Sequence, residues 1–121
     1  MDRKHSDSGG YAACGPPVVY ICSKYRGDVE RNVSNAQRYC RYAVEQGCIP
    51  IAPHLLFPQF IDEETERDLA LYMGRALMAR CSEVWVFGED RSEGMAAEIA
   101  SAAEKEMYIR FISEEEMACT Q

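Results

Sequence analysis

Two polar segments of this chain carry side chains that could bind an anion and attack a carbon atom beside it. The first, Ser92-Glu-Gly94, follows the apolar run Val84–Phe87 and precedes a helical pattern that contains Glu98. A helix N-terminus presents free backbone N–H groups that attract anions, and Ser92 and Gly94 suit close approach by a phosphate. Glu98 follows Ser92 by six residues, roughly 9 Å along the helix axis at about 1.5 Å per residue. A carboxylate so placed could face the sugar carbon that bears the base of a nucleotide.

The second polar segment runs from Ser23 to Asp28, directly after the apolar run Val18–Cys22. Lys24 and Arg26 are candidate positive charges for a phosphate, and Gly27 lets the backbone come close to it. We include Ser23 in this phosphate-binding set. The alternative interpretation is structural: Lys24 is solvated and Arg26 pairs with a neighbouring carboxylate.

Other side chains are candidates for contacts with a base or a sugar. His54 and Phe57 lie in an apolar segment with two prolines and could stack on a base, although a histidine in such a loop is often structural. Glu89 and Asp90 precede the first polar segment and belong to the same group. The two histidines lie far apart and have no metal-ligand spacing, so we expect neither a metal nor a cofactor.

Strands alternating with helices would position these side chains. Apolar runs predict strands at Val18–Cys22, Cys48–Ala52, Glu83–Phe87 and Met107–Ile112, with Tyr20 and Trp85 as core residues. Helices are expected from Asp28 to Gly47, from Asp62 to near Cys81, and from Ser92 onward, with Pro53–Ile61 as a loop and Ser113–Ala118 as an acidic turn or short helix. The expected buried stripes are Val29, Val33, Ala36, Cys40, Ala43 and Val44, then Leu69, Met73, Ala76 and Leu77, then Met95, Ile99 and Ala103.

This alternation predicts an α/β fold, a single Rossmann-like or flavodoxin-like three-layer sandwich over residues 18–121, after a disordered tail at 1–17. Parallel strands with right-handed crossovers favour the strand order 2-1-3-4. In such sheets ligands bind beyond the carboxyl ends of the strands, where the strand order reverses. Both polar segments should therefore meet at one site.

Composition narrows the range of partners. The chain has 121 residues and a formal net charge of −7, which argues against binding a nucleic acid polymer through a basic surface. Its six cysteines form no C-x-x-C pair, its first ten residues are polar, and its apolar runs are short. We expect a cytoplasmic protein without disulfides that does not enter a membrane.

The segments Val19–Gly27 and Ser92-x-Gly94-x-x-x-Glu98 resemble the nucleoside 2-deoxyribosyltransferase-like superfamily. That superfamily includes deoxynucleoside 5′-monophosphate N-glycosidases and many uncharacterised phage and bacterial proteins. The resemblance covers about residues 18 to 112 and implies a nucleoside or nucleotide ligand. It also implies that Glu98 is the nucleophile that attacks the anomeric carbon, and that the protein is a homo-oligomer.

One position departs from the family pattern. The resemblance implies an aspartate seven residues before Cys81, where this chain has Gly74. A nucleophilic carboxylate works with an acid that helps the base to leave. Other carboxylates could take the place of this acid, although none is at the matching position. They are Asp62, Glu66, Asp68, Glu89 and Asp90.

Three functions remain open at this point. The first is an enzyme that cleaves or transfers at the N-glycosidic bond through Glu98. Without the partner acid, the protein would instead be a non-catalytic binder or sponge for a nucleotide-derived signal of the ADP-ribose type, as in phage counter-defence. The third reading is an oligomeric scaffold, with the segment Phe57–Phe60 suited to contact a neighbouring copy.

Overall fold

A four-stranded parallel sheet forms the centre of the molecule in a computed structural model that describes residues 15–119. The strands are β1 (Val18–Cys22), β2 (Ile49–Ile51), β3 (Glu83–Phe87) and β4 (Tyr108–Ile112), in the order β2-β1-β3-β4. The predicted fold class and strand order are confirmed. The predicted tail lies almost entirely outside the described residues.

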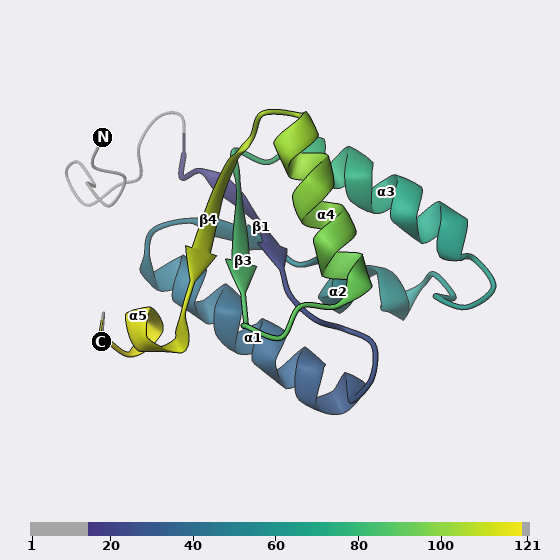
Figure 1. Ribbon diagram of the computed structural model, residues 1–121, viewed down its shortest axis with the longest axis horizontal. Helices are drawn as coiled ribbons and strands as arrows, with labels where there is room; N and C mark the ends of the chain where they lie inside the picture. Colours follow the sequence, from purple (N-terminus) through teal and green to yellow (C-terminus); the bar gives the residue numbers. More distant parts are fainter. Residues whose placement is uncertain (1–14, 120–121) are drawn as a thin grey trace.

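Helices cover both faces of this sheet (Figure 1). They are α1 (Val29–Glu45), α2 (Pro53–Leu56), α3 (Arg67–Ala79), α4 (Glu93–Glu104) and α5 (Glu114–Cys119), with a 3-10 helix, η2, at Phe57–Gln59. Figure 1 shows α3 beside α4 on one side of the sheet, and α1 with α5 on the other. No helix of the described part is both long and apolar enough to cross a membrane.

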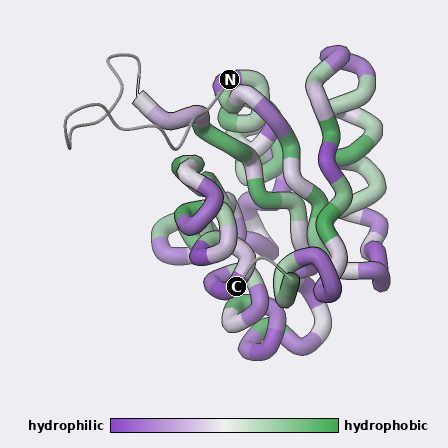
Figure 2. The backbone as a smooth tube through the Cα atoms, turned by 90° about the vertical axis from the view of Figure 1, so that its left-hand side faces the viewer, coloured by the Kyte–Doolittle hydropathy of each residue, from purple (hydrophilic) through white to green (hydrophobic). Residues whose placement is uncertain are grey.

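The alternation of side chains along β1 divides the core into two layers. Val19 and Ile21 pack on the side of α1, with Trp85 and Phe87 of β3. Tyr20 and Cys22 face the other way, toward α3 and α4. Figure 2 shows how the hydrophobic stretches gather in the strands, whereas many turns and loops around them are hydrophilic. The face of β1 that carries Tyr20 borders the candidate site described below.

The predicted buried stripe of α1 was partly wrong. Val29 and Val44 are 41% and 47% exposed, whereas Tyr39 and Tyr42 are buried. A helix of 17 residues is roughly 25 Å long, and a strand of five residues is roughly 16 Å. The two ends of α1 therefore extend past the sheet, while between them the ring of Tyr39 stacks on that of Phe87, the last residue of β3.

The predictions for the segment between β2 and β3 also need correction. Pro53–Ile61 is not a loop but contains α2 and η2, because a proline suits the first position of a helix. Asp62 does not begin the next helix. Its side chain accepts hydrogen bonds from the backbone N–H groups of Glu64 and Thr65, which forms a separate turn before α3 starts at Arg67.

The buried face of α3 differs from the predicted one by about one residue. Leu69 and Met73 are 41% and 42% exposed, and the buried residues of α3 are Ala70 and Met78. Gly74 lies next to the hydroxyl of Tyr20, which projects from the sheet toward this helix: an added Cβ there would be 3.8 Å from it. In α4 the predicted Met95 is buried and Ile99 packs against the core, as does Ala102, whereas the predicted Ala103 is exposed.

Candidate functional site

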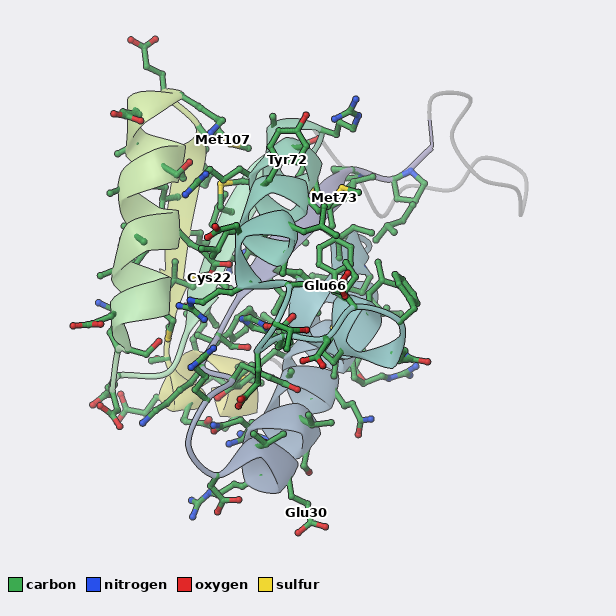
Figure 3. The ribbon with its side chains drawn as sticks, turned by 90° about the vertical axis from the view of Figure 1, so that its right-hand side faces the viewer. Cys22, Glu30, Glu66, Tyr72, Met73 and Met107 are labelled. Atoms are coloured by element: carbon green, nitrogen blue, oxygen red, sulfur yellow. The ribbon has the colours of Figure 1, made fainter. Side chains whose placement is uncertain are left out.

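A cavity of about 340 Å³ lies on the α3–α4 side of the sheet. Figure 3 views this side of the molecule, with Cys22 of β1 seen between α4 and α3. The cavity brings together side chains from β1, the β1–α1 loop, α2, α3 and α4. The predicted site residues that line it are Arg26, His54, Phe57, Ser92, Gly94 and Glu98, and Gly74 lines it as well.

Glu98 reaches into this cavity from the second turn of α4. Its carboxylate Oε2 accepts a hydrogen bond of 2.6 Å from the hydroxyl group of Tyr20. Burial raises the pKa of Glu98 above its ordinary value, while the hydrogen bonds from Tyr20 and Cys22 lower it in part. A carboxylate with little water around it is a stronger nucleophile and base than a solvated one. From this position the carboxylate of Glu98 can attack a carbon atom of a ligand or accept a hydrogen bond from a sugar hydroxyl.

Tyr20 was predicted only as a core residue, and this interpretation was incomplete. The side chain is 1% exposed, yet its hydroxyl lies at the cavity and holds Glu98 in place. Burial, followed by the nearby Glu98, raises the pKa of Tyr20, so the phenol stays protonated and keeps donating. The only signal in the sequence was a polar atom within an apolar strand.

The first turn of α4 forms one wall of the cavity. Ser92 caps the helix, and its Oγ accepts a hydrogen bond of 3.2 Å from the backbone N–H of Met95. The hydroxyl proton of Ser92 stays available to a ligand. Gly94 has no positive φ, and a Cβ added there would meet only Ser92 Oγ, at 3.8 Å. The free protein thus has no steric need for glycine at this position.

Substitution of Gly94 by alanine tests whether a ligand approaches the backbone here. We expect Gly94→Ala to keep or slightly raise the melting temperature, because alanine favours a helix by about 1 kcal/mol over glycine. We also expect it to weaken nucleotide binding about tenfold or more, measured by calorimetry on both proteins. Unchanged affinity would show that the ligand does not pack against this turn.

The β1–α1 loop, which carries Arg26, is fixed by a side chain of α1. The side-chain amide of Asn32, on α1, donates hydrogen bonds to the backbone carbonyls of Tyr25 and Arg26, at 2.9 and 3.1 Å. Gly27 follows with φ +103°, a conformation that other residues rarely adopt. Gly27 does not line the cavity, so it shapes the loop that presents Arg26.

The remaining predicted site residues lie elsewhere. Lys24 forms an ion pair of 2.7 Å with Asp90, and both line a separate polar hollow together with Glu89. Ser23 is buried and lines neither cavity. The two polar segments do meet, as the topology implied, but their side chains divide between two sites.

His54 packs against the ring of Tyr25 at a distance of 4.8 Å between ring centroids and an angle of 16°. Both rings line the cavity, together with Phe57 from η2. Burial lowers the pKa of His54 to about 4. This histidine is therefore neutral at physiological pH, and the group offers flat, apolar surfaces of the kind on which a base stacks.

The lowered pKa of His54 predicts an acid-sensitive fold. The stability from its neutral form is fully present above about pH 6.5 and is lost as the pH falls toward 4. At about 1.36 kcal/mol per pKa unit, the loss is about 3 kcal/mol. His54→Phe keeps the flat ring and removes the titration, so the variant should lose less stability over this range in urea unfolding. Equal losses in the two proteins would contradict this prediction.

Four charged residues at the cavity were not predicted from the sequence. They are Glu63, from the turn before α3, Arg67 and Arg75 of α3, and Glu93 of α4. A helix face rich in arginine is ordinarily solvated, so the pattern alone did not single them out. Within residues 15–119, no group of three or more metal-binding side chains is placed to hold a metal ion.

Comparisons with known proteins agree with the architecture. The model of a family described as "Domain of unknown function (DUF7768)" matches residues 17–112. A solved 2-deoxyribosyltransferase from the psychrotolerant bacterium Bacillus psychrosaccharolyticus superposes with a TM-score of 0.61 and 13% identity, over 79% of this chain and 72% of that one. None of the curated proteins matches the sequence significantly. The fold is thus nucleoside deoxyribosyltransferase-like, as the resemblance implied.

Proposed function

The chain belongs to the DUF7768 family, and on that premise we propose that its cavity binds a nucleoside or nucleotide and cleaves or transfers at the N-glycosidic bond through Glu98. One observation carries the proposal. The half-buried Glu98, whose carboxylate is held by Tyr20, lies in the same cavity as Arg26 and the N-terminal turn of α4. Together these groups match a sugar with an anion on one side, and the rings near His54 match a base on the other.

The proposed chemistry has two steps. A carboxylate oxygen of Glu98 forms a bond to the anomeric carbon while the bond from that carbon to the base nitrogen breaks, and the base leaves with the bonding electrons and takes up a proton. Water then attacks the same carbon, releases Glu98 and gives the free sugar, or a second base takes the place of water. Tyr20 keeps the carboxylate oriented throughout.

A second function is favoured by Gly74. This residue lines the cavity at the position where the resemblance implies an acid, and its backbone offers no group to protonate a leaving base. General acid help contributes about 10²- to 10⁴-fold to a rate. Without it, the alternative we propose is a receptor that holds an intact nucleotide-derived ligand of the ADP-ribose type.

Product analysis separates the two functions. The purified protein is incubated with nucleosides and nucleotides of each base, and free base is quantified by chromatography while binding is followed by thermal shift. Release of free base supports cleavage. Stabilisation by a ligand that is recovered intact supports the receptor. If no compound is cleaved or stabilises the protein, both functions are wrong.

A further inference from the structure

The arginines of this protein fall into two groups. Most of those in the described residues have partners: Arg38, Arg41 and Arg110 form ion pairs, Arg80 donates to a backbone carbonyl, and Arg91 lies over the ring of Phe111. No ion pair or hydrogen bond of the guanidinium group is found in the described part for four others, which are Arg26, Arg31, Arg67 and Arg75. Three of these four line the cavity, in a chain whose formal net charge is −7.

These three arginines approach the cavity from two sides. Arg26 comes from the β1–α1 loop, and β1 lies next to β3, which leads into α4, whereas Arg67 and Arg75 come from α3. Along α3 the latter two begin roughly 12 Å apart, at about 1.5 Å per residue. One phosphate at Arg26 and the α4 N-terminus would leave the arginines of α3 without an anion.

The carboxylates of the cavity do not neutralise these charges. Glu63 and Glu93 line it as well, but neither forms an ion pair with the three arginines in the described residues. Glu98 is hydrogen-bonded to Tyr20 instead. Guanidinium groups bind phosphates through paired hydrogen bonds, and such charge-assisted bonds are about twice as strong as neutral ones.

We propose that the ligand of this cavity is a nucleotide with at least two phosphate groups, one bound by Arg26 and the α4 N-terminus and the next by Arg67 and Arg75. The inference rests on the proposed nucleotide site and specifies its ligand class. The phosphates belong either to a nucleoside diphosphate or to a diphosphate that links the nucleoside to a second sugar. Both share the same recognition chemistry.

Calorimetry on the full-length protein tests this inference with nucleosides, nucleoside monophosphates, nucleoside diphosphates and ADP-ribose, at two salt concentrations. We expect the affinity to rise at least about tenfold from monophosphate to diphosphate, and to fall as salt increases. If ADP-ribose binds more tightly than ADP, the ligand is a diphosphate that links the nucleoside to a second sugar. If ADP binds more tightly, the ligand is a nucleoside diphosphate.

Three variants locate the second phosphate. Arg67→Gln and Arg75→Gln should each weaken diphosphate binding roughly ten- to hundredfold and leave monophosphate binding nearly unchanged. Arg31→Gln, on α1 outside this cavity, is the matched control and should change neither. Equal affinity for mono- and diphosphates, or equal loss in the control, overturns the inference while the nucleotide site stands. If no nucleoside or nucleotide binds, both this inference and the proposed function are wrong.

Discussion

Replacing Glu98 with glutamine is expected to lower the release of free base by on the order of 10³-fold or more, because the attacking oxygen becomes part of an uncharged amide. Glutamine has nearly the same shape as glutamate and can still accept a hydrogen bond from Tyr20. Binding of an intact nucleotide should therefore be much less affected than cleavage. Single-turnover assays with a saturating nucleotide measure the chemical step separately from binding. Cleavage at the wild-type rate would show that Glu98 is not the nucleophile.

The same variant should be more stable than the wild type at neutral pH. The pKa of Glu98 is raised in the folded protein, mainly by burial, so the fold favours its protonated form. Stability is then highest below the pKa of the unfolded chain, about 4.3, and falls as the pH rises through the folded value. Glu98→Gln removes this loss, so its melting temperature should exceed that of the wild type at pH 7 to 8. The difference should shrink below about pH 4.

Replacing Gly74 with aspartate is expected to raise the rate of base release by about 10²- to 10⁴-fold, the usual contribution of a general acid. A Cβ at this position meets only the hydroxyl of Tyr20, at 3.8 Å, and that hydroxyl contacts Glu98 at 2.6 Å. The new carboxyl group would enter the cavity beside Glu98. Two carboxyl groups that close cannot both ionise easily, so one holds a proton that it can donate to a leaving base.

Gly74→Asn is the matched control for this gain. Asparagine fills the same volume and cannot act as an acid, so it should leave the rate of the wild type unchanged or lower it. A gain that appears only with aspartate, and that is lost in the double variant with Glu98→Gln, supports a pair of catalytic carboxyl groups. If the Gly74→Asp variant binds nucleotides but releases base no faster than the wild type, protonation of the leaving base does not limit the rate of cleavage.

The order of strands could be predicted from the sequence because the runs Val18–Cys22 and Val84–Phe87 are apolar throughout and are separated by helical patterns. The faces of the helices were harder to predict. In α3, Leu69 and Met73 have the larger apolar side chains, yet both are more than 40% exposed, whereas the smaller Ala70 is buried. At Gly74 of the same helix, an added Cβ would meet the hydroxyl of Tyr20 at 3.8 Å. This packing depends on tertiary contacts that no local pattern contains.

The position of the site could be predicted from the sequence, but the direction of several of its side chains could not. The parallel sheet places the ends of β1 and β3 together, and this much follows from the topology. Beyond the last residue of a strand, however, the turn decides where each side chain points. Lys24 and Asp90 therefore pair in a separate hollow, whereas Arg26 reaches the cavity. The contribution of α3 to the cavity depends on how this helix packs on the sheet.

The parallel pairing of β1 with β3 has a consequence for how this protein folds. Val19 lies opposite Glu83 in the register, so the central ladder cannot form until two strands far apart in the chain have met. Tyr20 and Glu98, which are 78 residues apart, meet only after that step. Non-local contacts of this kind slow folding. We therefore expect the ligand to slow global unfolding, and to have little affinity for any intermediate in which the centre of the sheet has not yet formed.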